Sequence, residues 1–109
     1  MKLYWQQLGQ GPPVLILPGL LGSADNWRTI AQGLASHYTL YLIDHRNHGR
    51  SFHNDEMTYE AMAADLKHWM TQQGIADPTL VGHSMGGKVV MQFAQTYPQA
   101  LSRLIVVDI

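Results

Sequence analysis

The chain has no cysteine, which excludes disulfides and thiolate metal sites and favours a reducing compartment. Charged residues make up only 14% of the 109 residues, and the seven basic ones form no stripe, which argues against nucleic-acid binding. The N-terminus lacks the apolar stretch of a secretory signal. The longest apolar run, from Val14 to Leu21, is interrupted by Pro18 and Gly19 and is too short to span a bilayer. These absences predict a cytoplasmic protein with neither membrane nor nucleic-acid partners.

Short apolar runs alternate with helical patterns along the whole chain. Hydrophobic residues make up 46% of the sequence, which is typical of a globular domain. The pattern predicts strands over 3–8, 14–17, 38–43, 79–81 and 104–107. It also predicts three helices: one capped by Asp25 or Asn26, one capped by Thr58, and one that begins after Ser84. Strands that alternate with helices imply right-handed crossovers and an α/β fold with a mostly parallel sheet. Loops at the carboxyl ends of such strands meet at one edge, where ligands bind.

The segment Gly82-His83-Ser84-Met85-Gly86 joins one of these strands to the next helix. Gly-x-Ser-x-Gly in a strand–turn–helix setting is typical of a nucleophile elbow, which lifts a serine hydroxyl clear of the backbone. Ser84 is therefore the candidate nucleophile. Met85 opens the helix, so its backbone N–H is a candidate oxyanion donor. In the alternative interpretation, the glycines only punctuate a βα loop and Ser84 caps the helix.

Three motifs together resemble the α/β-hydrolase family, and the resemblance covers the whole chain. They are Pro18-Gly19-Leu20-Leu21-Gly22-Ser23, Asp44-His45-Arg46-Asn47-His48-Gly49-Arg50-Ser51, and the elbow extended to Lys88. The match is most similar to small bacterial carboxylesterases related to the eleventh abhydrolase-domain group. It implies an eight-stranded sheet of which this chain supplies the N-terminal part, through about the sixth strand. The family's lid, its last two strands and its catalytic histidine would lie downstream.

The resemblance also assigns roles to individual positions. Leu20 matches the oxyanion-loop position, where the main chain is the donor. Asp108, 24 positions after Ser84 and at the end of the last strand, matches the catalytic acid of this branch. Asp44 is a weaker candidate acid that the family pattern assigns to holding the Arg46 loop. Pro18 departs from the family, because relatives commonly carry histidine there, which removes a hydrogen bond that supports the loop.

No histidine in the sequence is a convincing general base. The side chain of His83 should point away from the elbow, and His37, His53 and His68 are typical of surface positions. Loop histidines such as His45 and His48 are usually structural or solvated when no further ligands accompany them, so we expect no metal and no cofactor. Loss of one triad member can cost on the order of a million-fold in turnover, so we expect this chain alone to be nearly inactive.

The leading functional hypothesis is a serine esterase or thioesterase that acts on a small-molecule acyl substrate through Ser84. Other α/β-hydrolase chemistry, such as C–C bond hydrolysis or a haloperoxidase reaction, is an alternative that the fold alone does not exclude. A third hypothesis is a non-catalytic domain that binds a partner through the open sheet edge left by the last strand. An open edge of this kind can also self-associate.

Overall fold

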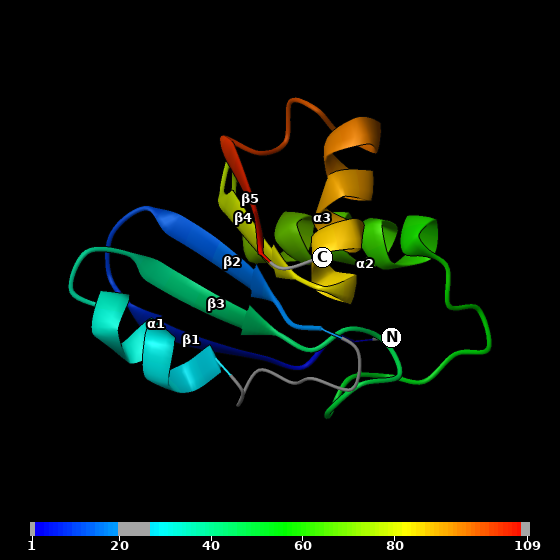
Figure 1. The fold of residues 1–109 in the computed structure, drawn as a ribbon, viewed down its shortest axis with the longest axis horizontal. Helices are drawn as coiled ribbons and strands as arrows, with labels where there is room; N and C mark the ends of the chain where they lie inside the picture. Colours follow the sequence, from blue (N-terminus) through cyan, green and yellow to red (C-terminus); the bar gives the residue numbers. More distant parts are fainter. Residues whose placement is uncertain (1, 20–26, 108–109) are drawn as a thin grey trace.

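The computed structural model describes residues 2–19 and 27–107. The elements follow the order β1 (Trp5–Gly9), β2 (Pro13–Leu17), α1 (Arg28–Leu34), β3 (Thr39–Ile43), α2 (Tyr59–Gln73), β4 (Thr79–His83), α3 (Met85–Thr96) and β5 (Arg103–Val107). They build a sheet of order β1-β3-β2-β4-β5, in which β1 is antiparallel to β3 and the other pairs are parallel. Figure 1 shows α2 and α3 together on one side of this sheet and α1 on the other. The predicted α/β fold with a mostly parallel sheet is confirmed.

Local sequence signals set both ends of α2. The hydroxyl of Thr58 accepts a hydrogen bond from the Ala61 N–H at 3.0 Å, which satisfies one of the free donors of the first turn. Gly74 ends the helix with a left-handed backbone at φ 69°, a conformation that glycine adopts without steric cost. Within the described residues, no helix is long and apolar enough to cross a membrane.

Helix α1 differs from its prediction. Its N-cap position is Trp27, which makes no side-chain capping bond, and the predicted capping residues Asp25 and Asn26 lie outside the described residues. The sequence spacing predicts an apolar face made of Trp27, Ile30, Ala31 and Leu34, and this is wrong in part, because Ile30 is 53% exposed while Ala31 is fully buried. This helix has only seven residues and covers the end of the sheet that carries β1 and β3. Such a short helix buries a narrow stripe, so apolar spacing alone did not identify its buried side.

The core lies on both faces of the sheet because β2 is central and buries alternate side chains on each face. Leu15 and Leu17 pack on the α2 and α3 side with Leu66, Val90 and Phe93. Val14 and Ile16 pack on the opposite side, together with Ala31, Leu40 and Leu42. A strand buried on both faces reads as a continuous apolar run, which is why this segment was predictable.

Strand β5 pairs with β4 on one side and forms an edge of the described sheet. The continuous apolar run at 104–107 predicts a buried strand, but Leu104, Ile105 and Val107 are 38–47% exposed, so this prediction is wrong for the structure. Among the described residues, no further strand pairs with β5.

The loop that follows β3 is anchored to α2 by an ion pair. Nε and Nη2 of Arg46 donate to the two carboxylate oxygens of Asp65, each at 2.7 Å, and Nη1 donates to the Glu56 carbonyl at 2.8 Å. The Arg46 side chain is 7% exposed and that of Asp65 is 14% exposed. The pair thus bridges segments 19 positions apart in the sequence and fixes the loop against the helix.

Replacing Asp65 should expose the dependence of the fold on this anchor. Asp65→Asn leaves the buried guanidinium of Arg46 without its counter-charge, which should lower the free energy of unfolding by roughly 3 kcal/mol. Urea denaturation measures the change, with Asp55→Asn as the matched control because Asp55 is fully on the surface. Equal stability of the two variants would show that the Arg46–Asp65 pair contributes nothing to folding.

Candidate active site

Ser84 lies between the last residue of β4 and the first residue of α3, in a backbone conformation that serine rarely adopts. Its φ is 54° and its ψ is −114°. Such a conformation costs about 1–3 kcal/mol and persists only where its surroundings impose it. The strained serine at a strand–helix junction is the geometry expected of a nucleophile elbow.

Two glycines allow the turn to close. A Cβ on Gly82 would lie 2.3 Å from the Gly86 carbonyl oxygen. A Cβ on Gly86 would lie 2.2 Å from the Leu17 carbonyl oxygen and 2.6 Å from that of Pro18. The elbow therefore packs backbone against backbone, both on itself and on the end of β2, and no larger residue fits at either glycine.

The loop after β2 touches Ser84 directly. A Cβ placed on Gly19 would lie 3.2 Å from the Cβ of Ser84 and 3.2 Å from Nδ1 of His83. The two loops thus approach each other closely at Gly19, where a side chain would meet Ser84 and His83. The sequence predicted that the loops at Gly19 and Ser84 meet at one sheet edge, and the structure brings them together.

Ser84 is half-buried, and its backbone is tied to neighbouring elements. Its N–H donates to the Val107 carbonyl at 3.2 Å, and its own carbonyl accepts from the Lys88 N–H at 3.2 Å. Its side chain makes no capping hydrogen bond to α3, so the alternative in which Ser84 serves as a side-chain cap is wrong. Met85 is the first residue of α3, so its N–H has no acceptor inside the helix and faces the N-terminal end.

Two predicted site residues, Leu20 and Asp108, lie outside the described residues. Their described chain neighbours do meet at the elbow. Gly19, which precedes Leu20, contacts Ser84. Val107, which precedes Asp108, pairs with His83 and accepts the Ser84 N–H.

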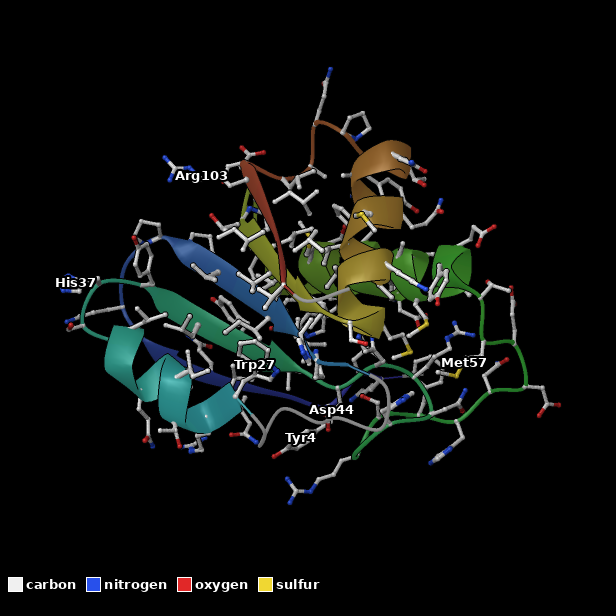
Figure 2. The ribbon with its side chains drawn as sticks, viewed as in Figure 1. Tyr4, Trp27, His37, Asp44, Met57 and Arg103 are labelled. Atoms are coloured by element: carbon white, nitrogen blue, oxygen red, sulfur yellow. The ribbon has the colours of Figure 1, made fainter. Side chains whose placement is uncertain are left out.

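Asp44 organises the loop after β3. It is 2% exposed, its Oδ2 accepts from the Arg50 N–H at 3.1 Å, and its backbone carbonyl accepts from the Ser51 hydroxyl at 2.6 Å. A Cβ on Gly49, whose φ is 52°, would lie 1.9 Å from the same carboxylate. Asp44 therefore holds the loop together, as the sequence predicted. Figure 2 shows it at the arrowhead end of β3, while His37 and Arg103 lie at the opposite end of the sheet.

His45 and His48, predicted as ordinary loop residues, are buried. His45 is 3% exposed, and its Nε2 lies 3.1 Å from the Pro18 carbonyl oxygen. His48 is 6% exposed, and its Nδ1 lies 2.9 Å from the Arg46 carbonyl oxygen. A carbonyl only accepts, so each of these ring nitrogens carries the hydrogen and donates. Burial lowers the pKa of His45 to about 4, the bond to Pro18 opposes that shift, and His48 adds to it.

The other histidines are engaged elsewhere or lie on the surface. The His83 ring packs edge-on against Trp27, with the ring centroids 5.8 Å apart, and its Nδ1 lies near Gly19. His37, His53 and His68 are exposed. Among the described residues, no histidine is bonded to Ser84.

A cavity of about 600 Å³ lies between the loop after β3 and α2, away from the elbow. Arg46, Asp65 and Trp69 are among its lining residues, and neither Ser84 nor Gly19 is. Ser84 and the loop beside it are the better candidate site, because Ser84 is a nucleophile held in a strained turn, whereas the Arg46 and Asp65 side chains of this cavity are already paired with each other.

Comparisons with known proteins agree with the fold described above. A family model described as the alpha/beta hydrolase fold matches residues 12–109. The sn-1-specific diacylglycerol lipase ABHD11 of Danio rerio is 44% identical over 103 residues, which cover 93% of this chain and 32% of that protein. Esterase YbfF of Escherichia coli is 38% identical over 97 residues, which cover 89% of this chain and 38% of that protein.

A solved marine microorganism esterase has a TM-score of 0.94 and 46% identity, with 96% of this chain and 41% of that chain covered. The chain thus spans about a third of the length of the curated relatives it matches.

The close approach at Gly86 can be tested by adding one methyl group. In Gly86→Ala the new Cβ meets the backbone of β2, which cannot move aside, so the free energy of unfolding should fall by about 1–3 kcal/mol. Gly33→Ala is the control: it adds the same methyl group to α1 where nothing lies within 4 Å. That change should stabilise the protein by roughly 0.5–1 kcal/mol. Urea denaturation measures both, and a neutral Gly86→Ala would contradict the packing described.

The depressed pKa of His45 predicts an acid-dependent loss of stability. In the unfolded chain the ring titrates near 6.5, whereas in the folded chain it titrates near 4, so the unfolded state binds more protons between these values. The contribution of neutral His45 is complete above pH 6.5 and falls as the pH drops toward 4, by about 2–3 kcal/mol in all. The difference in unfolding free energy between wild type and His45→Gln, measured from pH 7.5 to 4.5, should shrink accordingly. A difference independent of pH would contradict the assignment.

Proposed function

The chain belongs to the α/β-hydrolase fold family, and from that premise we propose that it carries the nucleophile of a serine hydrolase that cleaves carboxylic esters or thioesters. The observation that carries the proposal is Ser84 itself, held at φ 54° where β4 passes into α3, with Gly19 against its Cβ. The similarity to a lipase and to esterases supports ester chemistry over other reactions of the same fold.

The oxyanion donors in this proposal are main-chain groups. The N–H of Met85 opens a 12-residue helix, so the helix dipole adds to its attraction for negative charge. The N–H of Leu20 is the second proposed donor, supported by the contact of its neighbour Gly19 with Ser84. Removal of one such donor typically costs 10²- to 10³-fold in turnover, which sets the expected contribution of each, about 3–4 kcal/mol.

The proposed acid is Asp108, supported by the pairing of Val107 with His83 and by the bond between Ser84 and the Val107 carbonyl. The proposed base is a histidine from outside this sequence. His45 and His48 already donate to backbone carbonyls, and the His83 ring packs on Trp27. We propose the esterase activity for the complete protein and near-inactivity for the 109 residues alone.

The proposed reaction proceeds in two steps, acylation of Ser84 and hydrolysis of the acyl-enzyme. The Ser84 hydroxyl attacks the acyl carbon, and its proton passes to the base. The negative charge of the tetrahedral intermediate forms on the former carbonyl oxygen, which accepts hydrogen bonds from the N–H groups of Leu20 and Met85. The intermediate collapses, the protonated alcohol or thiol leaves, and an acyl-enzyme on Ser84 remains. Water, deprotonated by the same base, then releases the carboxylic acid and restores the serine.

Substitution of the serine tests the proposal directly. In the complete open reading frame that contains this sequence, Ser84→Ala should lower turnover of a short-chain p-nitrophenyl ester by about 10⁶-fold, because the acyl-enzyme can no longer form. A fluorophosphonate probe should label the wild type and not the variant. Ser102→Ala is the matched control, because Ser102 is exposed and lies just before Arg103, the first residue of β5, whereas Ser84 is next to the last residue of that strand.

Each alternative predicts a different result. Labelling at Ser84 without ester turnover would favour another reaction of the fold, such as C–C bond hydrolysis. Absence of labelling in the wild type would favour a non-catalytic binding domain. Retention of ester turnover in Ser84→Ala would overturn the proposed function.

A further inference from the structure

Met57 is an exposed methionine whose sulfur has a polar partner. Its side chain is 39% exposed, and its Sδ accepts a hydrogen bond from Nδ2 of Asn47 at 3.2 Å. Figure 2 shows Met57 where the long connection after β3 leads into α2. Thr58, the N-cap residue of α2, follows it directly. A thioether sulfur is a weak acceptor, so the bond is weak as long as the sulfur is unmodified.

Asn47 holds the loop after β3 in its folded shape. Its φ is 64°, a conformation that asparagine tolerates better than most residues. Its backbone N–H donates to the Phe52 carbonyl at 2.8 Å. Its side chain exchanges two hydrogen bonds with Asn54: Nδ2 donates to the carbonyl of Asn54, and Oδ1 accepts from the N–H of Asn54, both at 2.8 Å. The bond from Nδ2 to Met57 joins this loop to the residue that precedes the N-cap of α2.

The other described methionines lack this combination of exposure and a donor. Met91, on α3, is 37% exposed, and no hydrogen bond to its sulfur is found within residues 2–19 and 27–107. Met62 and Met70 are 2% and 3% exposed and belong to the core. Met91 is therefore a natural comparison for Met57, because the two side chains are almost equally exposed and differ in whether a donor faces the sulfur.

We propose that Met57 is a site of reversible oxidation whose sulfoxide tightens the loop after β3. In the reaction with hydrogen peroxide, a lone pair of the sulfur attacks one peroxide oxygen and the O–O bond breaks. The sulfur gains that oxygen and is oxidised by two electrons, while the proton of the transferred oxygen passes to the departing hydroxide, which leaves as water. Methionine sulfoxide reductases catalyse the return to the thioether.

Oxidation changes the strength of the bond that Asn47 donates. The sulfoxide group is polar, and its oxygen is a stronger acceptor than a thioether sulfur. This oxygen is attached to the sulfur that already lies 3.2 Å from Nδ2, and the rotatable bonds of methionine let it turn toward the N–H. Because Met57 lies on the surface, the added oxygen disrupts no core packing. The loop after β3 is then tied more strongly to the start of α2.

Peptide mass mapping tests whether Met57 is oxidised. In the complete protein treated with hydrogen peroxide, Met57 and Met91 should be oxidised at least about tenfold faster than Met62 and Met70, because reactivity follows exposure of the sulfur. Oxidation of Met57 as slow as that of the two core methionines would overturn the proposal.

Hydrogen exchange of the same samples tests whether the loop tightens. In oxidised wild type, exchange of the amides in the segment 47–57 should slow by about 3- to 10-fold, because local opening must break a stronger bond. Treatment with methionine sulfoxide reductases should restore the original rates. Met57→Leu is the matched control, since the same treatment oxidises its other methionines but should leave exchange of this segment unchanged. Unchanged or faster exchange in oxidised wild type would overturn the proposal.

Asn47→Asp identifies the donor. Aspartate keeps an oxygen for the Asn54 N–H and also tolerates a positive φ, but it has no N–H to donate to the sulfoxide. Met57 should still be oxidised in this variant, without slower exchange, and slowing equal to that of wild type would show that Asn47 is not the partner. If Asn47→Asp does not fold, oxidised wild type compared with oxidised Met57→Leu still decides the question. Neither readout uses ester turnover, so the result is independent of the role proposed for Ser84.

Discussion

The candidate site depends on a close backbone approach between the start of α3 and the end of β2. Only a glycine at position 86 lets the helix approach the carbonyls of Leu17 and Pro18 this closely. The approach puts the first turn of α3 beside the residues that follow β2, so two separate elements meet next to Ser84. The strain at Ser84 is part of the same arrangement, because the chain must reverse within one residue to bring the helix back over the strand.

Most of the framework was predictable from the sequence because local chemistry specifies it. The apolar run at Val14 predicts a strand buried on both faces, and Thr58 and Gly74 set the ends of α2 by capping bonds that involve only neighbouring residues. The elbow was predictable for the same reason, since its two glycines stand within five consecutive residues. Helix α1 was predicted less well, because which side of so short a helix is buried depends on the sheet beneath it and not on its own spacing.

The burial of His45 was not predictable from local pattern. The loop from Asp44 to Ser51 is polar and contains the turn-forming residues Asp44 and Asn47, so its sequence is typical of a solvent-exposed connection. In the structure, the loop instead folds inward around the Asp44 carboxylate. The bond that His45 makes in the interior joins two loops, because its acceptor, the Pro18 carbonyl, lies 27 positions earlier in the chain. Finding that acceptor requires knowing that β2 and β3 are neighbours, which is tertiary information.

The loop after β3 thus connects the stability of the fold to the geometry of the site. Arg46 fastens it to α2, Asp44 fastens it to itself, and His45, between them in the chain, reaches the loop after β2. Adjacent residues have alternating roles because their side chains leave the backbone in different directions, so one segment can be anchored on one side and can support the site on another. Because these three consecutive side chains bond to three different segments, the loop after β3 ties α2, its own backbone and the end of β2 into one unit.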